Sequence, residues 1–196
     1  MNLNNLHEIF RKYIEKFEYI NTVHEEIYKW KIAEEFQSLD VNAEDFESEM
    51  KRFLKISENL IDNGYSMPFT GLAEYAKQEP ETVRKMFKDL YNNDGTDLKD
   101  KQNRIDTFLT SCEKLRKKYA PDSHLYVNNQ RSAMQFLFLR YPDNNYMYKA
   151  TQAKSFADCV EFYDDWGPMN DFKIEVFYRM CDMLVEEIQN YLQSVG

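Results

Sequence analysis

The chain has 196 residues, a formal net charge of −9, five glycines and five prolines. This length allows one domain or two small lobes, and the scarcity of glycine and proline predicts long helices. The charge argues against general affinity for nucleic acid, and no apolar run reaches the roughly 18 residues that span a bilayer.

Apolar residues recur at steps of three and four along most of the chain, which is the spacing of one helix face. In the first half, this pattern predicts helices over residues 3–20 and 23–36, which form one bent helix if Asn21-Thr22 does not break it, and over residues 42–61. A short helix is expected over residues 71–78. The next helix should cover residues 80–91, because a proline fits the first turn of a helix.

The turn NNDGTD, residues 92–97, is the clearest break and the expected boundary between two lobes, 1–92 and 97–196. After it, the pattern predicts helices over residues 98–119, 128–141, 151–160 and 171–188. A strand is not predicted anywhere, apart from an extended pair of residues within Tyr-Met-Tyr at 146–148. The sequence therefore predicts an all-α fold, an irregular bundle of about seven to eight helices in a single domain.

Positive charge gathers in one part of the chain. Residues 113–154 contain eight basic and three acidic side chains. Residues 1–50 contain five basic and twelve acidic side chains, and residues 155–196 contain two basic and nine acidic ones. In proteins that bind single-stranded nucleic acid, aromatic rings stack on bases while lysine and arginine neutralise phosphates. The candidate contact residues within or beside the aromatic part of this segment are Arg131, Arg140, Tyr146, Tyr148, Lys149 and Lys154.

An alternative explains the same segment without a ligand. The tyrosine rings would be buried between helices with their hydroxyls in water, and the basic segment would contact the acidic ends of the same chain. Composition and spacing leave both interpretations open.

Motifs of catalysis and metal binding are absent from the sequence. The three histidines lie far apart, and no glycine-rich phosphate loop or nucleophile elbow occurs. The three cysteines, Cys112, Cys159 and Cys181, have no paired spacing, which favours a reducing cytoplasm. We therefore expect a cytoplasmic protein that is not an enzyme and that has no catalytic residues, metal or cofactor.

Two stretches carry a family resemblance. MQFLFLRYPDNNYMYKATQAKSFADCV, residues 134–160, resembles a segment upstream of the motor in McrB-like AAA+ proteins of modification-dependent restriction systems. FTGLAEYAKQEPETVRKMFKDLYNND, residues 69–94, is similar to the region that precedes it. The resemblance implies a bacterial defence complex with a nucleotide-driven ring, a partner nuclease and variable N-terminal regions that recognise DNA or another target. This chain has no motif for nucleotide hydrolysis or DNA cleavage.

Three functions are compatible with these features. The first is a non-catalytic recognition or adaptor module of an McrB-like restriction system, with DNA, an AAA+ motor or a nuclease subunit as partner. The second is a protein–protein interaction scaffold, which the amphipathic C-terminal helix and the acidic chain ends favour. The third is a small-molecule sensor with an aromatic pocket near Trp166.

Overall fold

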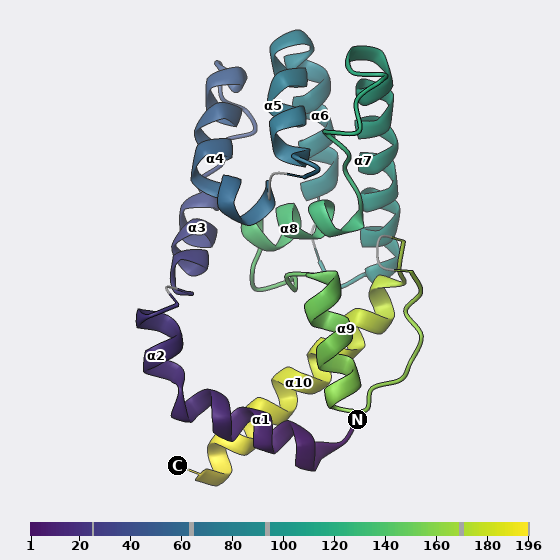
Figure 1. Cartoon of the computed structure of the whole chain (residues 1–196). Helices are drawn as coiled ribbons and strands as arrows, with labels where there is room; N and C mark the ends of the chain where they lie inside the picture. Colours follow the sequence, from purple (N-terminus) through teal and green to yellow (C-terminus); the bar gives the residue numbers. More distant parts are fainter. Residues whose placement is uncertain (25, 63–64, 93–94, 169–170, 196) are drawn as a thin grey trace. The chain divides into compact units, whose positions relative to one another are not determined.

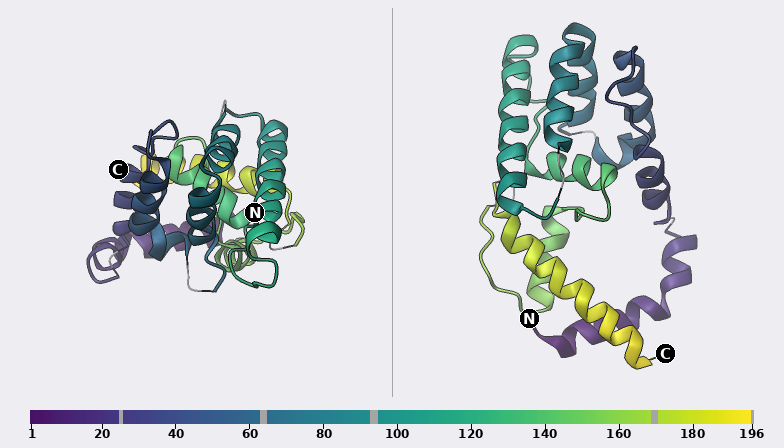
Figure 2. Two further views of the ribbon diagram at one scale, coloured as in Figure 1. Left: turned by 90° about the horizontal axis from the view of Figure 1, so that it is seen from above. Right: turned by 180° about the vertical axis from the view of Figure 1, so that it is seen from behind.

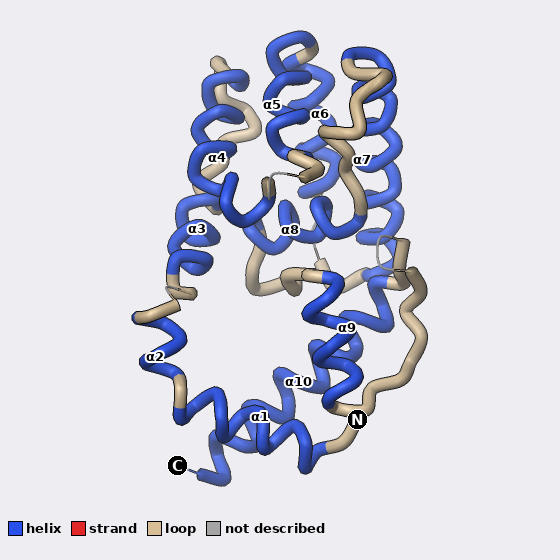
Figure 3. Tube along the Cα trace, viewed as in Figure 1, coloured by secondary structure: helices blue, strands red, loops and turns tan. Residues whose placement is uncertain are grey.

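The computed structural model describes residues 1–24, 26–62, 65–92, 95–168 and 171–195. These residues form ten α-helices and no strand (Figure 3), so the predicted all-α class is confirmed. The expected number of helices was too low. One reason is that the first predicted helix is broken at Lys16, which separates α1 (Leu3–Glu15) from α2 (Phe17–Thr22). None of the described helices combines the length and the apolarity needed to cross a membrane.

The helices belong to two compact units. Residues 1–28 and 148–196 form what we call the terminal unit, and residues 29–147 form the central unit. The boundary expected at residues 92–97 is therefore wrong. The helices on either side of that turn pack together, with the rings of Phe87 and Phe108 at 5.5 Å. Residues 93–94 of the turn lie outside the described residues.

The central unit is built from six helices, of which α8 is the most enclosed. They are α3 (Tyr28–Phe36), α4 (Phe46–Ile61), α5 (Pro68–Gln78), α6 (Pro80–Tyr91), α7 (Leu98–Tyr119) and α8 (Gln130–Arg140). Helices α4 to α7 stand beside one another, and α8 crosses them (Figures 1 and 2). Eight of the eleven α8 residues are buried, as expected for a helix with neighbours all round.

Phenylalanine rings from several helices make the core of this unit. The ring of Phe136 on α8 lies 5.1 Å from that of Phe69 on α5 and 5.4 Å from that of Phe87 on α6. Phe108 of α7 lies 6.0 Å from the same ring. All three contacts are edge-to-face, the arrangement that the ring quadrupoles favour. Phe136 therefore packs α8 against three other helices, α5, α6 and α7.

Helix α5 approaches the loop before α8 too closely for a side chain at Gly71. A β-carbon there would lie 2.5 Å from Cβ of Tyr126 and 3.2 Å from its Cα. Tyr126 cannot easily yield, because it has a left-handed φ of 64° and its backbone N–H donates to the carbonyl of Ser66 at 2.5 Å. Only glycine fits this contact without movement of the backbone.

We expect Gly71→Ala to lower the free energy of unfolding by about 1–3 kcal/mol through overpacking. Urea unfolding followed by circular dichroism measures this loss. Glu74→Ala, at an exposed position of the same helix, is the control and should stay within about 0.5 kcal/mol of the wild type. A Gly71→Ala protein as stable as the control would contradict the close contact.

The terminal unit joins both ends of the chain through α1, α2, α9 (Ala150–Cys159) and α10 (Ile174–Val195). The start of α1 is bonded to the end of α9, since the Asn2 N–H donates to the Val160 carbonyl at 2.6 Å. Further along α1, His7 Nε2 lies 2.6 Å from Glu187 Oε1 on α10. Helix α1 therefore contacts both other long elements of this unit (Figure 1).

Candidate interaction surfaces

The contact residues predicted from the basic segment do not form one cluster within either unit. Arg131, Arg140 and Tyr146 belong to the central unit, whereas Tyr148, Lys149 and Lys154 belong to the terminal unit. Arg131 lies at the beginning of α8 and Arg140 at its end, about 14 Å apart along the helix axis. The structure of each unit therefore gives no compact basic–aromatic site.

The two arginines differ in their surroundings. Arg140 is half-buried, its Nη1 donates to the carbonyl of Gln37, and its guanidinium lies 5.6 Å from the ring centre of Tyr141. Arg131 is also half-buried, and its side chain makes no hydrogen bond or ion pair with the described residues. Arg140 thus has a structural partner, while Arg131 keeps its charge available.

Of the two interpretations of the tyrosines, the buried one holds for Tyr148. Its ring is fully buried, stacks on Phe172 at 4.0 Å and meets the edge of Phe177 at 5.0 Å. Burial raises the pKa of the Tyr148 hydroxyl, and the indole of Trp166 partly opposes this rise. The residue immediately precedes the N-cap of α9, where the aromatic core of the terminal unit encloses it. It cannot stack on a base, whereas Tyr146 is only half-buried.

The two lysines lie at the beginning and on the body of α9. Lys149 is half-buried at the N-cap position of the helix. The Nζ of Lys154 lies 4.4 Å from the ring centre of Trp166, a cation–π distance. Lys154 therefore already has an aromatic partner in its own unit.

The connector between α8 and α9, residues 141–149, is hydrogen-bonded to α7 through a buried lysine that was not identified from the sequence. The Nζ of Lys101 donates to the Asn144 carbonyl at 2.9 Å and to Asn145 Oδ1 at 2.7 Å. The side-chain amide of Asn145 in turn donates to the Tyr141 carbonyl at 2.9 Å. This part of the basic segment is therefore held by internal hydrogen bonds.

A small pocket lies beside Trp166, where the sequence suggested an aromatic site. Its volume is about 170 Å³, and Lys154, Asp158, Phe162 and Tyr163 also line it. Typical ligand pockets measure about 300–1,000 Å³. The Asp165 carboxylate in its wall accepts from the Gly167 N–H at 2.8 Å. The pocket is therefore smaller than typical ligand pockets.

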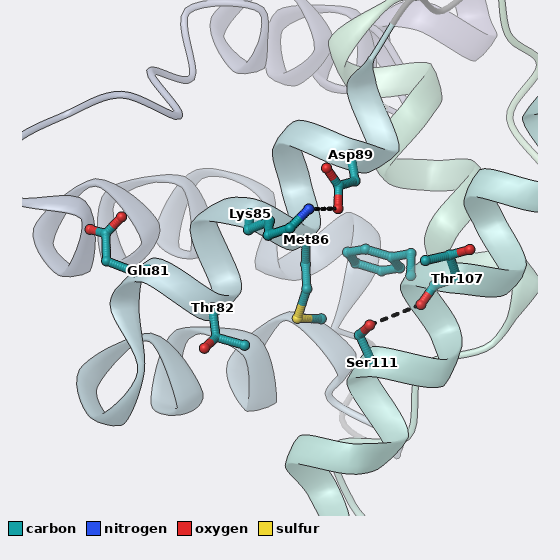
Figure 4. A pocket seen from close by; sticks show the side chains of 8 residues that line it. Glu81, Thr82, Lys85, Met86, Asp89, Thr107 and Ser111 are labelled. Carbon is teal, nitrogen blue, oxygen red and sulfur yellow. Dashed lines mark hydrogen bonds and ion pairs between the residues drawn. The ribbon is translucent and has the colours of Figure 1, made fainter.

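A larger pocket of about 520 Å³ lies between α6 and α7 (Figure 4). Met86 and Phe108 form its apolar part, and six polar side chains line the rest. Each of the six already has a partner: Lys85 bonds Asp89 at 2.6 Å, for example, and the Ser111 hydroxyl donates to the Thr107 carbonyl at 3.0 Å. A ligand would have to compete with these bonds.

An exposed apolar surface lies on the terminal unit. Tyr13, Ile14 and Phe17 near the junction of α1 and α2 are 49, 47 and 54% exposed. Val185, Ile188 and Leu192 recur at steps of three and four on α10 and are 42, 39 and 51% exposed. We call these six residues the α1–α10 apolar surface.

The helices that carry the two halves of this surface contact each other. The ring of Phe10 on α1 lies 5.6 Å from that of Tyr191 on α10. Tyr13 and Ile14 come one turn after Phe10, and Leu192 is next to Tyr191. Helix α1 covers only one side of the end of α10, so the other side remains exposed. Six half-exposed side chains present on the order of 500 Å² of apolar area.

The described residues show no cluster of three or more His, Cys, Asp or Glu side chains placed to hold a metal ion. Two of the cysteines, Cys112 and Cys181, are buried, and Cys159 is exposed. Burial raises the pKa of the Cys181 thiol to about 12 and that of Cys112 further. At neutral pH both buried thiols are therefore protonated and poor nucleophiles.

Comparison of the chain with family models, curated proteins and solved structures found no match.

Proposed function

We propose that this chain is a non-catalytic helical interaction module that binds another protein through the α1–α10 apolar surface. The observation that carries the proposal is the exposure of six large apolar side chains from two crossing helices. Contiguous apolar patches of several hundred Å² on a soluble domain are often functional, because leaving them in water costs free energy that binding a partner recovers. This proposal corresponds to the protein–protein interaction scaffold that the sequence favours on the basis of the amphipathic C-terminal helix.

The class of partner to test first comes from the resemblance of residues 69–94 and 134–160 to McrB-like proteins. That resemblance implies an AAA+ motor or a nuclease subunit in the same bacterial defence system. Within the proposal, this chain supplies the adaptor, and its partner supplies nucleotide hydrolysis or cleavage. Contact with DNA stays a prediction for Arg131, Tyr146, Lys149 and Lys154.

The test mixes the full chain with the protein products of the adjacent genes and measures complex formation by size-exclusion chromatography with light scattering. We expect a complex with one of them. A Phe17→Ser/Ile188→Ser double variant should weaken it by about tenfold or more, because hot-spot side chains at the centre of an interface carry most of the affinity.

Tyr65→Ser is the matched control, because Tyr65 is 82% exposed in the central unit. It should leave the complex unchanged. Circular dichroism should show that both variants keep the helical fold, since exposed substitutions rarely change stability by more than about 0.5 kcal/mol. A complex that survives the double variant, or a monomeric chain that binds none of these proteins, would contradict the proposed surface.

A further inference from the structure

We infer that the occupant of the α1–α10 apolar surface is a basic amphipathic helix of another protein. This inference rests on the proposed function and names the chemistry of the partner. It follows from the helical geometry of the surface, from the charge of the unit that carries it, and from the ion pairs beside it.

The geometry favours a helix as the occupant. Both sides of the surface are helical ridges. On one side the rings of Tyr13 on α1 and Phe17 at the start of α2 lie 5.8 Å apart, and on the other Ile188 and Leu192 are one turn apart on α10. A partner helix that repeats its own apolar residues at three and four positions can pack along such ridges. Its polar side would then remain in water.

The charge of the terminal unit favours a basic partner. Its residues, 1–28 and 148–196, include 14 acidic and 7 basic side chains. Residues 29–147 include 20 acidic and 18 basic side chains. Most of the net charge of the chain therefore belongs to the unit that carries the apolar surface. Two such units would repel each other on approach, so a second copy of this chain is a poor occupant.

The charged side chains beside the surface are mainly acidic, like those of the whole terminal unit. Glu18 follows Phe17, and Glu186 follows Val185; both are exposed and have no ion pair with the described residues. On α1, Arg11 and Lys12 are both paired with Glu8. Lys16 adds one exposed positive charge, which the two carboxylates outweigh. Lysine or arginine at the edge of a bound helix would meet Glu18 and Glu186.

The test uses three fluorescein-labelled peptides of about 18 residues, or five helical turns. One is an amphipathic leucine/lysine helix, one has the same leucines with glutamate in place of lysine, and one is a scrambled leucine/lysine sequence. Fluorescence anisotropy with the full chain should show that the leucine/lysine helix binds about tenfold or more tighter than the other two. Its affinity should fall as salt rises from about 50 to 300 mM.

Variants locate the bound peptide. Ile188→Ser should weaken leucine/lysine binding by about tenfold, Glu18→Gln/Glu186→Gln should weaken it less and reduce its salt dependence, and Tyr65→Ser should change nothing. Binding that Ile188→Ser leaves unchanged would overturn the inference, as would equal affinity for the leucine/glutamate helix.

The inference and the proposed function fail in different ways. A stable homodimer that Ile188→Ser dissociates would show that the surface binds protein but that its occupant is a second copy, which overturns the inference alone. A monomeric chain that binds none of the three peptides and none of the adjacent gene products would overturn both.

Discussion

Replacing Phe136 with alanine should lower the free energy of unfolding by about 3–5 kcal/mol. The Phe136 ring is fully buried and contacts rings on three other helices, those of Phe69, Phe87 and Phe108. Three surrounding rings cannot all move into the vacated space, because each is held by its own helix. The loss therefore includes the transfer free energy of the ring and the cost of a cavity.

Urea unfolding of the full chain, followed by circular dichroism, measures the effect. Phe138→Ala on the same helix is the matched control, since Phe138 is only half-buried and its ring partner, Trp30, is exposed. We expect the control to lose less than about half as much stability. Equal losses in the two variants would show that Phe136 is not at the centre of the core.

Asn145→Ala should cost about 2–4 kcal/mol, although the side chain is small and polar. Lys101 is fully buried, and the Asn145 side chain is one of its acceptors, at 2.7 Å. The substitution takes an acceptor from a buried ammonium group. It also removes the amide that donates to the Tyr141 carbonyl. Buried charges that lose a partner are among the most destabilising changes in proteins.

Asn144→Ala is the control for this prediction, because Asn144 is exposed and contributes its backbone carbonyl to Lys101, which alanine retains. Urea unfolding compares the two variants. A Lys101→Met/Asn145→Leu double variant should recover part of the stability, because it removes the buried charge together with its acceptor. If Asn145→Ala were no worse than Asn144→Ala, the hydrogen bonds at Lys101 would not hold the connector.

Helices could be predicted from the sequence wherever their signals are local. The predicted helices over residues 80–91 and 98–119 agree with Pro80–Tyr91 and Leu98–Tyr119, because a proline starts one and the Asp97 carboxylate caps the other. The predicted start at residue 71 was wrong. Helix α5 begins at Pro68, where the Asp62 carboxylate accepts from the backbone N–H groups of Phe69 and Thr70, both at 2.8 Å.

The candidate site could be predicted only in part. The stripe through Val176, Phe177, Met180, Leu184 and Ile188 follows from spacing alone, so the sequence predicted an amphipathic helix over residues 171–188. Spacing does not show that Phe177 and Met180 are buried whereas Ile188 is exposed. That difference depends on what each half of α10 packs against, because Phe177 contacts the rings of Tyr148, Trp166 and Phe172, whereas α1 meets the helix near Glu187.

The sequence by itself determined the all-α class, most helix positions and the uneven distribution of charge, because these depend on composition and on spacing within a few turns. The tertiary structure decided which residues share a unit and which of them reach the surface. Lys101 and Tyr148 show this best. Both have polar groups that usually lie at the surface, yet both side chains are fully buried. Burial depends on the neighbours that packing supplies from distant parts of the chain, and no local pattern specifies them.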